Sequence, residues 1–116
     1  LYGGGNNDEI YGNTGHDLIY GNDGDDKLFG NDGNDKIFSD AGNDYISGGK
    51  GNDVIDGGAG SDTMYGNSGN DIFNNITIED KLADGSAGDD IFNYKFTSGN
   101  GTTDISGGSG KDTLNN

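Results

Sequence analysis

Residues 12–73 read GNTGHDLIY, GNDGDDKLF, GNDGNDKIF, SDAGNDYIS, GGKGNDVID, GGAGSDTMY and GNSGNDIF, a nine-residue unit repeated without insertion or deletion. Residues 3–11, GGGNNDEIY, precede them in the same frame, with Asn6 in place of the glycine at the fourth position. The chain therefore holds eight consecutive units. A fixed period of this kind indicates a repeat architecture, in which each copy packs against its neighbours.

Two positions of the unit carry the same chemistry in every copy. The sixth position is aspartate and the eighth is a large apolar residue. The sixth-position residues are Asp8, Asp17, Asp26, Asp35, Asp44, Asp53, Asp62 and Asp71. The eighth-position residues are Ile10, Ile19, Leu28, Ile37, Ile46, Ile55, Met64 and Phe73. Chance does not keep two residue types in phase over so long a stretch.

The glycines predict where the chain turns. Glycine at the first and fourth positions, and glycine or asparagine at the second, are the residues that tolerate a positive φ. Asparagine fills the second position at Asn13, Asn22, Asn31 and Asn67, as a left-handed backbone requires. We therefore predict that the first six residues of each unit form a turn. The last three form a very short strand, whose eighth-position side chain faces inward.

One unit cannot bury its apolar residue alone, so stacked copies must share a core. Two units would close one coil of eighteen residues, with strands alternating between two facing parallel sheets. Units two apart in sequence then lie roughly 4.8 Å from one another. The sequence thus predicts an all-β parallel β-roll, or β-helix, with two short-stranded sheets and two columns of aspartates. One column holds Asp8, Asp26, Asp44 and Asp62, and the other holds Asp17, Asp35, Asp53 and Asp71.

The frame weakens in the last third of the chain. We predict a regular roll over residues 1–74, degenerate repeats with insertions or a loop over 75–97, and a continuation with an incomplete end over 98–116. In the unit NITIEDKLA, Asp80 takes the sixth position and Leu82 the eighth. Ile78 replaces a turn glycine there, and Asp84 is read as one extra residue.

Later units recover part of the pattern. Residues 85–93 restore an aspartate at Asp90, and residues 107–115 restore one at Asp112. In the unit between them Thr103 takes the aspartate position. Because threonine offers no carboxylate, the column of Asp80 should lose a site at Thr103.

The composition excludes several classes of protein. Of the 116 residues 28% are hydrophobic and 25 are glycine, and the formal net charge is −15, so an ordinary globular core is excluded. The acidic balance argues against nucleic acid and anionic membranes as partners. No apolar run approaches membrane-spanning length. Both ends fall in repeat-like sequence, so we expect the chain to be a piece of a larger protein.

The charge requires a cationic partner, because stacked aspartates repel one another. Ca²⁺ takes six to eight oxygens from carboxylates and backbone carbonyls in a flexible geometry, whereas Mg²⁺ demands a tight octahedron. Zinc is disfavoured because the chain has one histidine and no cysteine. An EF-hand loop is disfavoured too, since no segment places glutamate twelfth after an NDGDD-like start. The other acids, namely Asp23, Asp25, Asp32, Asp40 and Asp56, are predicted to be solvated surface.

The units GGKGNDVID, GGAGSDTMY and GNDGNDKIF resemble the repeats-in-toxin (RTX), haemolysin-type family, whose calcium-binding nonapeptide has the form GGxGxDxUx. The resemblance implies a right-handed parallel β-roll with Ca²⁺ held between successive coils by the sixth-position aspartates and turn carbonyls. It also implies export by type I secretion machinery from a Gram-negative bacterium, followed by folding in extracellular calcium. The parent protein would be a secreted enzyme or toxin with neighbouring domains.

Carried over to this sequence, the resemblance implies about six or more calcium ions. The carboxylate ligands would be Asp8, Asp17, Asp26, Asp35, Asp44, Asp53, Asp62 and Asp71, with Asp90 and Asp112 as weaker additions. The turn glycines of these sites would be Gly12, Gly15, Gly21, Gly24, Gly30, Gly33, Gly42, Gly48, Gly51, Gly57, Gly60, Gly66 and Gly69.

Two functions remain open at this point. The first is a calcium-binding structural module. The second is an adhesin-type module that uses the flat faces of the roll or the 74–97 segment. Tyr11 and Phe29 should stack on one outer face, with Tyr20 and Phe38 on the other. His16 has no serine or cysteine partner in the pattern, so we expect no catalytic site in this segment.

Overall fold

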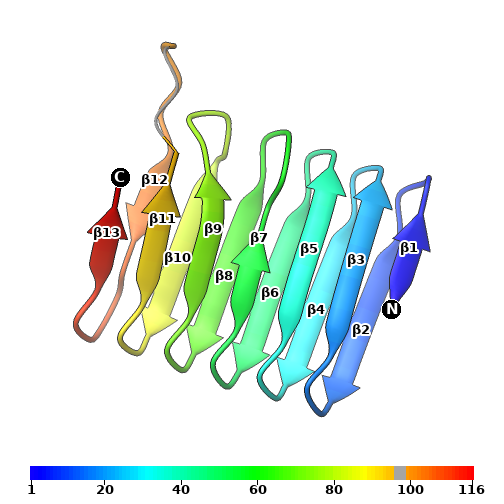
Figure 1. Cartoon of the computed structure of the whole chain (residues 1–116), viewed down its shortest axis with the longest axis horizontal. Helices are drawn as coiled ribbons and strands as arrows, with labels where there is room; N and C mark the ends of the chain where they lie inside the picture. The colour runs from blue at the N-terminus through cyan, green and yellow to red at the C-terminus, as the bar shows by residue number, and fades with distance from the viewer. Residues whose placement is uncertain (96–98) are drawn as a thin grey trace.

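The computed structural model describes residues 1–95 and 99–116, which form thirteen β-strands and no helix. The strands belong to two sheets that face one another (Figure 1). Their bounds are β1 (Tyr2–Gly4), β2 (Glu9–Thr14), β3 (Leu18–Asp23), β4 (Lys27–Asp32), β5 (Lys36–Ala41), β6 (Tyr45–Lys50), β7 (Val54–Asp56), β8 (Thr63–Ser68), β9 (Ile72–Ile76), β10 (Leu82–Ala87), β11 (Ile91–Tyr94), β12 (Asp104–Ser106) and β13 (Thr113–Asn115). The described chain therefore contains no helix long enough to cross a membrane.

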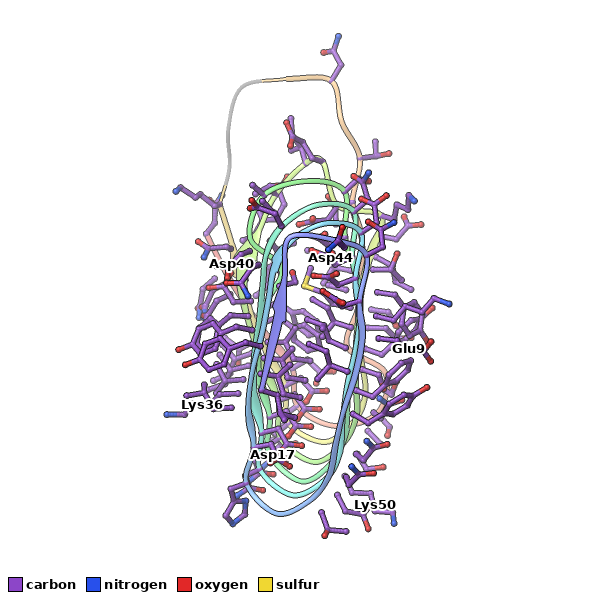
Figure 2. The ribbon with its side chains drawn as sticks, turned by 90° about the vertical axis from the view of Figure 1, so that its right-hand side faces the viewer. Glu9, Asp17, Lys36, Asp40, Asp44 and Lys50 are labelled. Atoms are coloured by element: carbon purple, nitrogen blue, oxygen red, sulfur yellow. The ribbon has the colours of Figure 1, made fainter. Side chains whose placement is uncertain are left out.

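The chain alternates between the two sheets. The odd-numbered strands follow one another in a seven-stranded sheet, and the even-numbered strands do so in a six-stranded sheet. All neighbours are parallel, and Ile19 pairs with Ile37 and Leu28 with Ile46, one coil further on. Viewed down the roll, each coil is a flattened ring (Figure 2). The predicted all-β parallel roll with two units per coil is confirmed.

Most strands are longer than predicted. They run from the seventh position through the third position of the next unit, so that β3, for example, has six residues. The second position keeps the predicted positive φ, which is 76° at Asn13 and Asn22 and 77° at Asn31 and Asn67. Pairing skips the first position and resumes at the second, as in Tyr20 with Phe38 and then Asn22 with Asp40. The prediction of a six-residue turn was therefore wrong, because the ladder passes through the left-handed residue.

The core is a seam of eighth-position side chains between the sheets. These side chains are fully buried at every such position from Ile19 to Phe73, whereas Ile10, in the first full coil, is half-buried. The seam includes an aromatic pair, Phe73 and Phe92, whose rings stack with centroids 4.8 Å apart. Ile76 is also fully buried there. The predicted inward direction of the eighth position is confirmed over the regular units.

The unit of residues 75–83 breaks its frame at a different place from the one predicted. Ala83, not Leu82, pairs with Met64 and is buried in the core. The backbone N–H groups of Lys81 and Leu82 both donate to the carbonyl of Asp62, at 2.8 and 3.4 Å. Two residues thus face one, as in a β-bulge. The extra residue therefore lies before Ala83, and the prediction that it is Asp84 was wrong.

The division of the chain at residues 74 and 97 stays a prediction. Strands β10 and β11 show that the predicted degenerate segment keeps the roll over its described part. Residues 96 and 97, and so the predicted boundary at 97, lie outside the described residues.

Candidate metal centre

The sixth-position aspartates lie in two columns, near opposite ends of the flattened ring. Figure 2 shows Asp44 near one end and Asp17 near the other, both on the inside of the coil. Burial is nearly complete, since the exposed fraction is at most 2% from Asp26 onward through Asp90. Asp8 and Asp17, in the first coil, are half-buried. The predicted columns are therefore present.

Each column is held together by one carboxylate oxygen of each aspartate. The backbone N–H of Asp17 donates to Oδ1 of Asp35, and that of Asp35 donates to Oδ1 of Asp53, both at 2.8 Å. The other column repeats the contact from Asp26 to Asp44, also at 2.8 Å. These bonds continue to Asp80 in one column and to Asp112 in the other. Every link joins a coil to the one that follows it.

The second carboxylate oxygen is the chemically unusual feature of the columns. It is buried, and it finds no hydrogen-bond donor anywhere in residues 1–95 or 99–116. The aspartates that share this unpaired Oδ2 are Asp8, Asp17, Asp26, Asp35, Asp44, Asp53, Asp62, Asp71 and Asp90. A buried anionic oxygen without a partner is strongly unfavourable, so these nine oxygens in two lines fit a site for bound cations.

The first-position glycines make room for these oxygens. A Cβ at Gly30 or Gly48 would lie 2.3 Å from Oδ2 of the aspartate five residues later, and one at Gly66 would lie at 2.2 Å. The predicted residues Gly12, Gly21 and Gly57 have the same contact, at 2.4 to 2.8 Å. In this position glycine is needed for space beside the carboxylate.

The fourth-position glycines serve a different purpose. Their φ is positive throughout the predicted set, namely Gly15, Gly24, Gly33, Gly42, Gly51, Gly60 and Gly69. A Cβ at Gly33 would lie 1.6 Å from the carbonyl oxygen of Gly15, one coil earlier. The carbonyl of such a turn glycine therefore lies directly against the corresponding turn glycine of the next coil. These carbonyls belong to residues two positions before the aspartates of the columns.

Burial changes the proton affinity of the carboxylates. It raises the pKa of Asp62 and Asp71 to about 7 and that of Asp53 to about 6. Each of these carboxylates accepts a hydrogen bond from the backbone N–H of the aspartate one coil earlier, which lowers its pKa and opposes the effect of burial. The neighbouring carboxylates of the column raise the pKa further. The pKa of Asp26, Asp35, Asp44 and Asp90 is raised by burial as well. The buried columns therefore favour the uptake of positive charge, whether as a proton or as a metal ion.

The donor set fits calcium better than the other common ions. No three acidic or histidine side chains converge on one point in the part of the chain that the structure describes. A site in a column would therefore combine two successive carboxylates with turn carbonyls, which is an all-oxygen set of the kind that Ca²⁺ accepts. The ligand assignment of individual residues stays a prediction.

The two weaker sites differ from one another. Asp90 is fully buried and carries an unpaired Oδ2, as the regular aspartates do. Asp112 is exposed, and its Oδ1 accepts the N–H of Asp90 at 3.1 Å. Thr103 occupies its predicted place, where its hydroxyl donates to the carbonyl of Thr77.

The sequence interpretation missed a second ladder at the fifth position. Asp25 is exposed, as predicted, yet its Oδ1 accepts the backbone N–H of Asn43 at 2.8 Å. Asn34 accepts the N–H of Asn52 in the same way, and Nδ1 of His16 accepts the N–H of Asn34 at 2.7 Å. The signal was the recurrence of side chains with an acceptor at this position.

A family model described as RTX calcium-binding nonapeptide repeat (4 copies) matches residues 2–37 and again residues 38–73, together more than half of the chain. No curated protein and no solved structure matches the chain. The two matched segments cover the regular coils and all eight aspartates of the two predicted columns.

Proposed function

Because the chain belongs to the RTX calcium-binding nonapeptide repeat family, we propose that it is a structural module that folds when it meets extracellular calcium. The observation that carries the proposal is the set of buried Oδ2 atoms, which lack a donor among the described residues. A carboxylate buried in this way is stable only if it is protonated or neutralised by a cation.

Folding and calcium binding should be one event. Each column brings together aspartates that are far apart in an unfolded chain, so the site does not exist before the coils stack. The formal net charge of −15 opposes compaction until cations are bound. Extracellular calcium modules bind at roughly 10⁻⁴ to 10⁻³ M. The chain would therefore stay unfolded in a calcium-poor cytosol and fold outside the cell.

The biological setting follows from the same proposal. We place the module in a secreted protein of a Gram-negative bacterium that leaves the cell by type I secretion, with a haemolysin-type toxin or a secreted enzyme as its parent. Its role would be to help a neighbouring domain fold or to act as a rigid spacer. The module itself would have no catalytic activity.

The test is a calcium titration of the metal-free chain followed by far-UV circular dichroism. We expect a cooperative gain of β-structure in the millimolar range, and little change with magnesium at the same concentrations. An equal response to magnesium, or none to calcium, would refute the proposal. Asp35→Ala should weaken calcium-driven folding by removing one member of a column, whereas Asp32→Ala, at an exposed surface position, should leave it nearly unchanged.

A surface-binding role is the second candidate, and the aromatic side chains favour it. Tyr11 and Phe29 stack with centroids 4.9 Å apart on one outer face, as Tyr20 and Phe38 do at 5.3 Å on the other. Tyr45 continues the first row and is 41% exposed. If this row binds a surface, Tyr11→Ser with Tyr45→Ser should abolish retention on bacterial cells and leave calcium-dependent folding intact. Unchanged retention would exclude this use of the row.

A further inference from the structure

The turn from Thr77 to Asp80 differs from every regular turn of its column. Asp80 is as deeply buried as the regular aspartates, with 2% of its surface exposed, and its Oδ1 accepts the N–H of Asp62 at 3.1 Å. Its Oδ2, however, accepts the backbone N–H of Thr77 at 2.7 Å. Both oxygens of Asp80 are therefore paired with protein donors, so this carboxylate lacks the unpaired oxygen that marks the other positions.

The same turn is closed by two further hydrogen bonds. The N–H of Asp80 donates to the carbonyl of Thr77 at 3.3 Å, and the N–H of Glu79 donates to the Thr77 hydroxyl at 3.2 Å. This reciprocal pairing of a threonine with an acid three residues later satisfies local backbone groups without outside help. Ile78 takes the place of the turn glycine and is not among the positive-φ residues of the described chain.

The following coil packs on this turn without supplying an acid. Thr103 stands one coil after Asp80 in the column, and its hydroxyl donates to the carbonyl of Thr77. A Cβ at Gly101 would lie 2.1 Å from the carbonyl oxygen of Ile78, so the two backbones are in close contact. The carbonyls of Thr77 and Ile78 thus face protein groups of the next coil.

We propose that calcium does not bind between Asp62 and Asp80, and that the Thr77–Asp80 turn closes this column with hydrogen bonds instead. The inference rests on the proposed function, because it concerns which steps of the columns take the ion. An ion at Oδ2 of Asp80 would displace the Thr77 N–H and leave a half-buried donor without its acceptor. The column of Asp8 then has three calcium-binding steps, ending at Asp62, and the column of Asp17 continues through Asp90.

The first test counts bound calcium in two variants of buried aspartates. Asp80→Asn is compared with Asp71→Asn, whose side chain is fully buried and carries an unpaired Oδ2. Calcium per chain is measured by equilibrium dialysis with atomic absorption at saturating calcium. We expect Asp80→Asn to bind as many ions as the unaltered chain and Asp71→Asn to bind at least one fewer. Loss of an ion in Asp80→Asn would overturn the inference.

A second pair keeps the inference testable if Asp80→Asn does not fold. Asp62 borders one calcium-binding step, whereas Asp53 borders two, one on each side. Asp53→Asn should therefore lose more ions than Asp62→Asn, and an equal loss would overturn the inference. An unaltered chain that binds no calcium would instead refute the proposed function, and with it this inference. The two failures are thus distinguishable.

Discussion

The regular coils and the coil that contains Asp80 close the same ring in two ways. In the regular coils, glycines give the turn its left-handed backbone, and the buried aspartate keeps one oxygen without a donor among the described residues. In the other coil, Asp80 accepts a hydrogen bond from the backbone N–H of Thr77, and Ile76 joins the core, where Phe73 stacks on Phe92 one coil further on. We infer from this comparison that a coil takes up a cation where its turn leaves a buried carboxylate oxygen without a hydrogen-bond donor.

The largest effect is expected from Gly33→Ala in a regular turn. The φ of Gly33 is 143°, and the added Cβ would lie 1.6 Å from the Gly15 carbonyl. The clash can be relieved only if the two coils separate, so we expect the free energy of unfolding to fall by about 3 kcal/mol or more. Circular dichroism at saturating calcium should then show incomplete folding. Gly5→Ala is the control, since its Cβ would meet nothing within 4 Å. Equal behaviour of the two variants would contradict the stacking of the turns.

A loss of nearly the same size should follow from Phe73→Ala. Phe73 is fully buried and stacks on Phe92. Its truncation leaves a cavity, so we expect the free energy of unfolding to fall by about 3–5 kcal/mol. Ile37→Val in the regular seam should cost about 0.5–1.5 kcal/mol. Thermal unfolding at saturating calcium would measure both. A loss for Phe73→Ala no larger than that for Ile37→Val would contradict the burial of the Phe73 ring in the core.

The pH dependence of folding should have opposite signs in the absence and in the presence of calcium. The pKa of Asp62 and Asp71 is raised from 3.8 to about 7, so the folded chain holds protons more tightly than the unfolded one. This contribution to stability is complete below the ordinary aspartate value and is lost as the pH rises through about 7. In a chelator we therefore expect more β-structure at pH 5.5 than at pH 8.

In calcium the opposite trend is expected, because protons compete with the metal for the same carboxylates. The calcium concentration needed for half-maximal folding should be higher at pH 5.5 than at pH 8. Circular dichroism titrations at the two pH values measure it. A pH-independent calcium-free chain would show that the carboxylates are not buried before calcium arrives.

The smallest effect is expected from Asp25→Ala in the fifth-position ladder. The change removes the acceptor of the exposed Asn43 N–H, which water can replace, so the loss should be about 0.5–1.5 kcal/mol. Asp25→Asn keeps an acceptor oxygen and should lose less. The midpoint of urea unfolding, measured in calcium, would distinguish the losses of stability in Asp25→Ala and Asp25→Asn. A larger loss for Asp25→Asn would mean that the charge, not the hydrogen bond, matters here.

Most of the fold could be predicted because the constraints repeat. The second-position asparagines predicted the left-handed residues, and the eighth-position residues predicted the seam, since each signal is present in every coil. Strand length could not be read in this way. Glycine and Asn22 favour a turn locally, yet the hydrogen bonds of the neighbouring coils carry β3 through them to Asp23.

The columns were predictable, but their exceptions were not. Leu82 has the residue type of the seam, and only the bulge at Lys81 and Leu82 shows that Ala83 takes its place. Asp80 has the residue type and spacing of a calcium ligand. That its second oxygen is used by Thr77 depends on a local turn, which residue types alone do not specify.

The stacking of one coil on the next also sets how the module responds to force. Within residues 1–95 and 99–116, each strand pairs with the strands one coil before and after it, and the two chain ends lie at opposite ends of the roll (Figure 1). A pull on the ends therefore loads the coils in series and peels the outermost one first. Each regular coil of eighteen residues would release roughly 60 Å of extended chain. Under tension the roll would lengthen in small steps of this size, and single-molecule stretching would detect one large rupture instead if the coils yielded together.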